Sequence, residues 1–263
     1  MILLMQLEYN GCCKDVIDYF NAINATTQQK TYKEMPQADI FGVSNTNLIW
    51  QSQVIINHGE FSLGFEMSDS MLYAMQNANE EKGGLKTYVF PQVFISSIDG
   101  KLNFEENDSN LHGIQFINDE SNHELICHYF EFDGYCTDVL QYYQQAFNIK
   151  ATSIEKYENS EKIKSALLIF KNGKNKYAIK LSDTPSSAQT NTNSYDPNAL
   201  LFYKNSTNPI LVLRKCGDEI LQNIFNSLSV GAKINKHPTL NENGIYHGSL
   251  IDRYGICWEL YSN

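Results

Sequence analysis

His123, Glu124 and His128 could do chemistry together, because they resemble the zinc-binding pattern H-E-x-x-H. In that pattern the two histidines are four residues apart and share one face of a helix. Here they are five apart, and the segment alternates like a strand. We therefore reject a zinc-protease site. The sequence also has no Ser-His-Asp order, nucleophile elbow, P-loop or dinucleotide fingerprint.

His128, Phe130 and Phe132 alternate along one predicted strand, 126–132, and should therefore share one of its faces. A histidine flanked by aromatic side chains could line a small-molecule pocket, with Tyr129 as the alternative aromatic if the opposite face is used. A lone histidine in such a place is more often structural than a base.

The other candidates surround a predicted hairpin near the end of the sequence. Tyr246 and His247 precede it, and Trp258 and Glu259 lie side by side on its last strand. Neighbouring residues of a strand point to opposite faces. If Glu259 faces a pocket, Trp258 should pack beneath the helices.

The six cysteines show neither a C-x-x-C pair nor regular spacing, so we expect reduced, mostly buried thiols. Cys12 and Cys13 stand at a predicted helix start, where the helix dipole could lower a thiol pKa. A structural role for this pair is favoured over a redox role.

An internal repeat sets out the elements that position these residues. Segment 8–20 recurs as 131–143, with Glu, Gly, Cys, Asp, Val and Tyr identical at matching positions. In each copy a strand leads through a glycine turn to a one-faced helix. Two or three strands follow each helix, so both copies predict a β-α-β-β-β module.

A third such module is predicted over 209–260, with a helix at 218–228 and a closing hairpin. A fourth should lie between 84 and 127, but its predicted strands, 88–98, 101–104 and 112–117, have no helical pattern between them. The polar segments 70–84 and 184–198 are predicted loops.

Three motifs, at 132–136, 181–183 and 248–259, occur in the same order as in the glyoxalase/bleomycin-resistance/dioxygenase (vicinal oxygen chelate) superfamily. Through these motifs the chain resembles that superfamily, in particular its PhnB-like branch. The resemblance implies an α+β fold of tandem βαβββ modules that form curved, cup-like mixed sheets. It implies a domain at 1–125 with a degenerate second module and a domain at 126–263 with two modules. On this basis we expect the small-molecule cup in the C-terminal half and treat the first half as its scaffold.

No cofactor follows with certainty from the resemblance, but the metal-using members of that superfamily hold a divalent metal with residues on the first and last strands of paired modules. His128 falls on the first ligand position and Glu259 on the last, but the position between them falls near Pro209, which cannot ligate. In the first copy Met5 matches His128, and Glu66 matches Lys180, so neither chemical residue is repeated.

Three functions remain open. The missing third ligand favours a metal-free binding protein, whose cup is lined by His128, Phe130, Phe132, Tyr246, His247 and Glu259. The alternative is a divalent-metal-assisted lyase, isomerase or transferase that uses His128 and Glu259. The third is a structural or regulatory dimer without a ligand, supported only by the degenerate module.

The composition limits the partners. The sequence has 20 Lys and Arg against 30 Asp and Glu, a formal net charge of −10, and no basic run. Nucleic acid and anionic membrane surfaces need clustered basic residues and are therefore not expected. No apolar stretch approaches the roughly 18 residues of a membrane span. We expect a cytoplasmic protein that binds a small molecule and forms a homodimer.

Overall fold

The computed structural model describes residues 1–9, 11–23, 25–35, 47–70, 92–96, 115–119, 124–185 and 209–263. In these ranges the helices are α1 (Cys13–Ala22), α3 (Cys136–Phe147) and α5 (Asp218–Leu228), with one 3-10 turn, η1 (Tyr32–Glu34). The strands are β1 (Ile2–Tyr9), β2 (Thr26–Thr31), β3 (Ile49–His58), β4 (Phe61–Asp69), β5 (Gln92–Ser96), β6 (Gln115–Asp119), β7 (Leu125–Phe132), β8 (Ser153–Lys156), β9 (Ile163–Asn172), β10 (Asn175–Asp183), β11 (Ile210–Arg214), β12 (Lys233–Leu240), β13 (Tyr246–Ile251) and β14 (Cys257–Tyr261).

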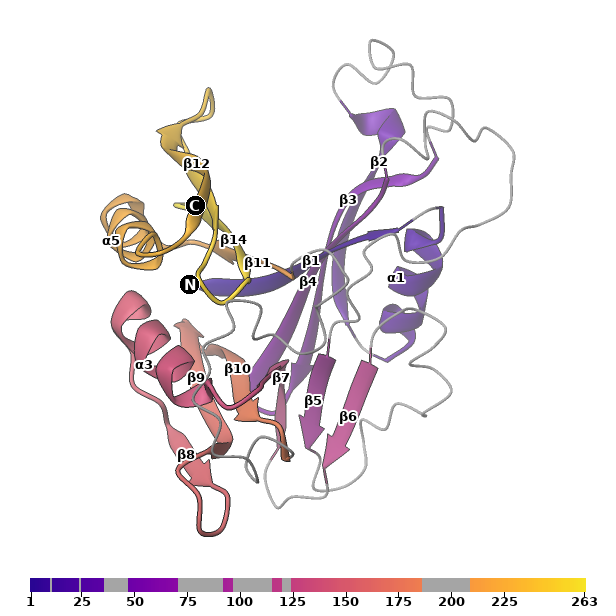
Figure 1. The fold of residues 1–263 in the computed structure, drawn as a ribbon. Coiled ribbons are helices and arrows are strands. Elements are labelled where there is room, and N and C mark those ends of the chain that lie inside the picture. Colours follow the sequence, from indigo (N-terminus) through magenta and orange to yellow (C-terminus); the bar gives the residue numbers. More distant parts are fainter. Residues whose placement is uncertain are drawn as a thin grey trace.

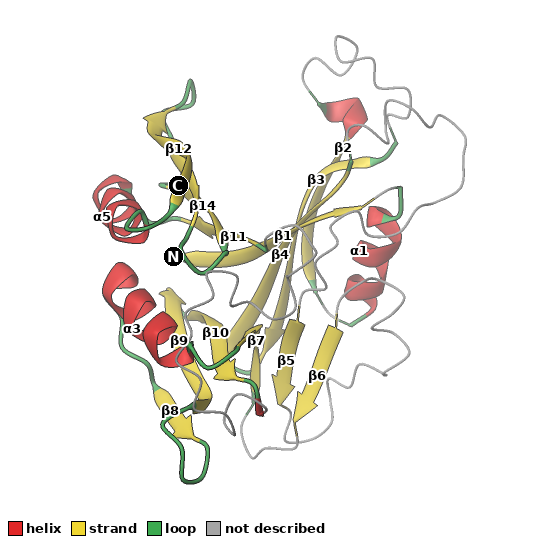
Figure 2. Cartoon of the chain, in the orientation of Figure 1, coloured by secondary structure: helices red, strands yellow, loops and turns green. Residues whose placement is uncertain are grey.

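All the described strands belong to one mixed, 14-stranded sheet, so the fold is α+β as predicted (Figure 2). The main order is β12-β13-β14-β11-β1-β4-β10-β7-β5-β6. Strand β3 pairs with β4 and β2, and β9 pairs with β10 and β8. In Figure 1, β2 and β3 rise on one side of the central strands β1 and β11, and β12 rises on the other.

The repeated modules are present as predicted. In the first, third and last modules the opening strand lies parallel to the closing strand: β1 to β4, β7 to β10 and β11 to β14. Strands β5 and β6 are parallel in the same way. The degenerate second module therefore keeps an opening and a closing strand. The predicted strand 101–104 and nearly all of both predicted loops lie outside the described residues.

The repeated residues build the same corner twice. Gly11 and Gly134 turn the chain from strand to helix at φ values of 81° and 85°, which L side chains rarely adopt. Asp69, at the end of β4, accepts a hydrogen bond from the Cys13 amide at 3.0 Å, and Asp183 accepts one from the Cys136 amide at 2.9 Å. Each aspartate thus satisfies an N-terminal amide of its own module's helix.

Module pairing differs from the expected division at 125/126. Strand β1 pairs antiparallel with β11, so the first module joins the last, and β5 pairs antiparallel with β7, so the second joins the third. A cup within 126–263 would need β7 and β11 as neighbours, but β10, β4 and β1 lie between them. The first half is therefore not a separate unit beside the second, because its first module pairs directly with the last module.

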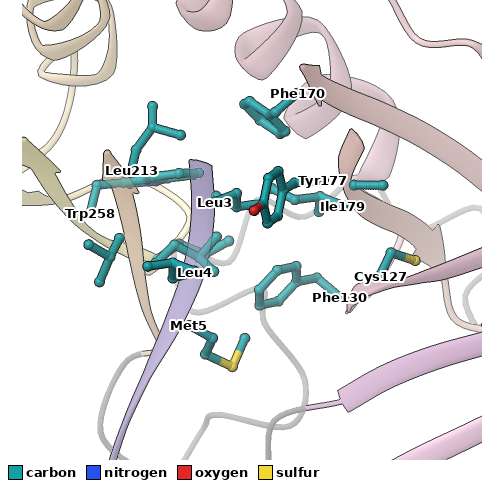
Figure 3. Packing of buried hydrophobic residues seen from close by; sticks show 14 of the residues in the cluster. Leu3, Leu4, Met5, Cys127, Phe130, Phe170, Tyr177, Ile179, Leu213 and Trp258 are labelled. Carbon is teal, nitrogen blue, oxygen red and sulfur yellow. The ribbon is translucent and has the colours of Figure 1, made fainter. Parts of the chain in front are cut away.

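One apolar core joins the two pairs of modules. Residues Leu3 and Met5 of β1 belong to the same buried cluster as Phe130 of β7 (Figure 3). Helix α3 packs against the last module: the rings of Phe147 and Trp258 lie 5.0 Å apart. Trp258 is fully buried, as predicted for the side of β14 opposite Glu259.

The cysteines are free thiols among the described residues, in agreement with the sequence. All except Cys12 are buried. Burial raises the pKa of the Cys13 thiol, with a further contribution from the nearby Asp69 carboxylate. The helix start therefore does not activate Cys13 as a nucleophile.

Candidate ligand-binding site

His128, Phe130 and Phe132 share one face of β7 as predicted, but that face is the apolar core. His128 is 2% exposed and both phenylalanines are 0% exposed. The His128 ring meets Phe65 of β4 edge-on, with centroids 5.7 Å apart. Neither ring nitrogen has a hydrogen-bond partner of good geometry among the described residues. Burial lowers the pKa of His128 to about 3, an effect that the nearby Gly64 backbone opposes in part.

His128 and its neighbour Tyr129 lie on opposite faces of β7. His128 pairs with Ile179 of β10, whereas its neighbour Tyr129 pairs with Lys180 on the opposite face. A shift of one residue along a strand exchanges its two faces. Tyr129 therefore points away from the apolar face that His128, Phe130 and Phe132 share.

His128 and Glu259 cannot share a metal ion. They lie on β7 and β14, with β10, β4, β1 and β11 between these strands. At about 4.8 Å per strand, the separation along the sheet is roughly 24 Å. Metal-ligand bonds are only about 2.0–2.2 Å long. The sequence places His128 on the first strand of one module and Glu259 on the last strand of another, but these two modules belong to different pairs.

His247 and Glu259 are brought together. The pair lies on β13 and β14, where His247 Nε2 is 2.5 Å from a carboxylate oxygen of Glu259. Lys236 of β12 lies 3.1 Å from His247 Nδ1 and can only donate, so Nδ1 accepts and Nε2 carries the proton. Tyr246 precedes His247 on the same strand, so its side chain points to the opposite face.

A polar cavity lies on the first module, where Arg214 of the last module reaches it. Its volume is about 210 Å³. It is lined by residues of β2, β3, β4 and β11, namely Gln28, Gln29, Lys30, Gln51, Ser52, Gln53, Glu66 and Arg214. Only polar and charged residues line this cavity, whereas ligand pockets are usually lined mainly by apolar side chains.

Arg214 crosses the boundary between these two modules. Its Nε donates to Glu66 Oε1 at 2.5 Å, although β1 lies between the strands that carry the two residues. The guanidinium carbon also lies 4.1 Å from the ring centroid of Tyr261. The ion pair holds one edge of the guanidinium group, and the tyrosine supports one of its faces.

Tyr261 connects this ion pair to His247 and Glu259. The rings of His247 and Tyr261 are parallel, with centroids 4.4 Å apart. Strand β14 lies between β13 and β11, so His247 and Arg214 approach Tyr261 from opposite sides. Burial, followed by the Glu259 carboxylate, raises the pKa of Tyr261, and Arg214 opposes this shift.

The residues of the cavity do not fit a divalent metal ion. Throughout the described ranges, no group of three His, Cys, Asp or Glu side chains could hold one. On the two opening strands, the residues in register with the glutamates are Gln6, opposite Glu66, and Val212, opposite Glu259. The Glu66 carboxylate already pairs with Arg214, whose fixed positive charge would repel a metal ion.

The sequence argument missed Arg214 and the four glutamines. Glu66 was noticed but set aside because Lys180 occupies its repeat position. One available signal was the run of polar residues at 26–31 together with the polar residues Gln51, Ser52 and Gln53 that lead into the next predicted strand. The other signal, the approach of Arg214 to Glu66, depends on strands far apart in the chain.

No helix in the described part of the chain is long and apolar enough to cross a membrane.

No family model matches the chain, and no curated protein matches it. Among solved structures, glyoxalase I of Zea mays superposes with a TM-score of 0.54 and 11% identity, covering 99% of this chain and 92% of that one. The PhnB protein of Bacillus cereus matches over 50% of this chain and 94% of its own, at 17% identity and a TM-score of 0.32. Protein PA1353 of Pseudomonas aeruginosa matches 50% of this chain and 92% of its own, at 18% identity and a TM-score of 0.37. The nearly full-length superposition on glyoxalase I concerns the fold, and it confirms the glyoxalase-type α+β fold that the sequence resemblance implied.

Proposed function

We propose that the protein binds a small polar molecule, without a metal, in the polar cavity on its first module, which Arg214 of the last module reaches. The observation that carries this proposal is the 210 Å³ cavity, whose lining includes the Arg214–Glu66 ion pair. The metal-free function was favoured from the sequence. The residues that support it are now those of the cavity, with His247 and Glu259 linked to it through Tyr261, in place of His128, Phe130 and Phe132.

Blocking the cavity tests the location. Gln28 of β2 faces Gln53 of β3, and tryptophan in its place should fill the cavity. The equivalent position in the third module is Ser153, which faces Leu167. In a thermal-shift screen of small polar compounds, we expect wild type and Ser153→Trp to be stabilised by the same compounds, and Gln28→Trp by none of them. Equal stabilisation of both variants would refute the location.

Divalent ions test the metal-free part of the proposal. Mg²⁺, Mn²⁺, Ni²⁺ and Zn²⁺ should leave the melting temperature unchanged, because the cavity has no set of free ligands. An ion that raises the melting temperature of wild type but not of Glu66→Gln would contradict this expectation.

A second candidate function is acid–base catalysis, for example a lyase or isomerase reaction, by His247 and Glu259. The 2.5 Å contact between them favours it, since a carboxylate that orients an imidazole is a common catalytic arrangement. The two candidates differ in the fate of the bound compound. A binding protein returns it unchanged after long incubation, whereas an enzyme converts it, and the conversion should be lost in His247→Gln.

The homodimer and the cytoplasmic location stay predictions from the sequence. Sedimentation equilibrium tests the dimer directly.

A further inference from the structure

We infer that the ligand of this cavity carries an oxyanion, a carboxylate or phosphate group, which binds to the terminal nitrogens of Arg214. The inference rests on the proposed binding function and names the chemical class of the ligand.

The first argument is the unused donors of Arg214. The guanidinium group has five N–H donors, and Glu66 is the only hydrogen-bond acceptor found for it in the described part of the chain. That bond uses Nε. The terminal nitrogens present parallel N–H groups, an arrangement that matches the two oxygens of a carboxylate or phosphate.

The second argument is that this guanidinium is held in place. Glu66 fixes its Nε edge and Tyr261 lies 4.1 Å from its central carbon, so few rotamers remain for the side chain. The side chain is 23% exposed, which reduces competition from water. A preorganised and partly desolvated cation binds an anion more tightly than a mobile surface arginine does.

The third argument is the local charge. The lining carries two cationic residues, Lys30 and Arg214, against the single acidic residue Glu66. The chain as a whole has a formal net charge of −10. A cavity with a positive balance in an acidic protein attracts anions and disfavours cations.

The remaining lining residues indicate the polarity and size of the rest of the ligand. The glutamines offer both side-chain donors and acceptors, whereas the Ser52 hydroxyl is buried and donates to the Met67 carbonyl; no apolar residue lines the cavity. Drug-sized ligands occupy roughly 300–1,000 Å³. The volume of about 210 Å³ therefore fits a smaller molecule that carries hydroxyl or amide groups beside its oxyanion.

The third module provides an internal control, because its equivalent positions lack this chemistry. Lys180 of β10 stands at the place of Glu66, and its partner on β9 is Leu167 in place of Gln53. A Lys180→Gln variant therefore removes a positive charge from the matching position without touching the cavity.

The test uses three probes of similar size: L-malate, glycerol phosphate and the neutral polyol erythritol. Binding is measured by calorimetric titration, and its location by the NMR signals of the glutamine side-chain amides. We expect malate, glycerol phosphate or both to bind and to shift these signals, and the comparison distinguishes carboxylate from phosphate. Affinity should fall about tenfold or more in Arg214→Gln, because a charged hydrogen bond is lost. It should be unchanged in Lys180→Gln.

The Glu66→Gln variant controls for the possibility that Arg214→Gln loses anion binding only because it misfolds. It removes the competing negative charge but keeps a side-chain oxygen that can accept from Arg214 Nε, so anion binding should tighten by roughly fivefold; weaker binding would overturn the inference. Failure of both anions to bind, or equal binding to Arg214→Gln, overturns the inference. If erythritol then binds and shifts the glutamine signals, the proposed function survives. If no compound of the wider screen is blocked by Gln28→Trp, the proposed function fails as well.

Discussion

Replacing His128 with methionine should remove a defined part of the protein's sensitivity to acid. Methionine is the matched choice, because Met5 occupies the equivalent place in the first module and is 1% exposed. His128 is buried at the contact of β7 with β4, and its pKa is lowered from 6.5 to about 3. Its neutral ring therefore stays unprotonated in the folded protein under mildly acidic conditions.

The magnitude follows from proton linkage. Below pH 6.5 the unfolded chain binds a proton at His128 and the folded chain does not, so stability is lost as the pH falls towards the folded pKa. Between pH 7 and pH 5 the unfolded state gains about 2 kcal/mol from this one site. At neutral pH the methionine variant should be more stable than wild type by about 1–3 kcal/mol, because a buried polar group without a partner is removed.

Urea denaturation at several pH values between 5 and 8 measures this directly. The difference in unfolding free energy between wild type and His128→Met should grow by about 2 kcal/mol from pH 7 to pH 5. A His237→Gln variant, at an exposed site on β12, should follow the wild-type profile. A wild-type minus His128→Met difference that does not change with pH would refute the neutral, buried histidine. So would an NMR titration of His128 with a midpoint near pH 6.5.

Three further substitutions test how the modules are built. Asp183→Ala leaves two buried amides of the third module without an acceptor, and should lower the unfolding free energy by about 2–4 kcal/mol in urea; a loss below about 0.5 kcal/mol would contradict the capping role. Tyr143→Phe removes the 2.6 Å hydrogen bond to Asp252 that ties α3 to the last module. It should cost about 1–2 kcal/mol in the same assay, and an unchanged midpoint would count against it. In Gly64→Ala the new Cβ would stand 2.2 Å from a methyl group of Leu4. We therefore expect the unfolding free energy measured by calorimetry to fall by about 1–3 kcal/mol. A variant as stable as wild type would show that the Leu4 side chain can move away without cost.

Much of the local architecture could be predicted from the sequence. The recurrence of segment 8–20 at 131–143 correctly predicted two strand–turn–helix units, because glycine turns and one-faced helices depend on neighbouring residues. The closing hairpin and the burial of Trp258 followed from strand alternation in the same way. The sequence of the second module has no helical pattern between its predicted strands, and of this module the structure describes β5 and β6, which are parallel neighbours.

The site could be predicted only in part. His247 and Glu259 lie together because both belong to one hairpin, whose pairing is local. His128 was placed in the cup because the strand pattern shows which residues share a face but not which face the helices cover. A continuous apolar run such as the one around His128 has no polar face to mark the side that stays open.

The sequence by itself determined the number of modules, their order and the corner residues that repeat in them, since these depend on contacts between residues near one another in the chain. Only the tertiary structure decided that the first module pairs with the last, because strands β1 and β11 are about 200 residues apart and antiparallel pairing leaves no local sign. That pairing brings Arg214 to Glu66 and Tyr261. Module pairing therefore adds the guanidinium group of Arg214 to a polar cavity whose other lining residues all belong to the first module.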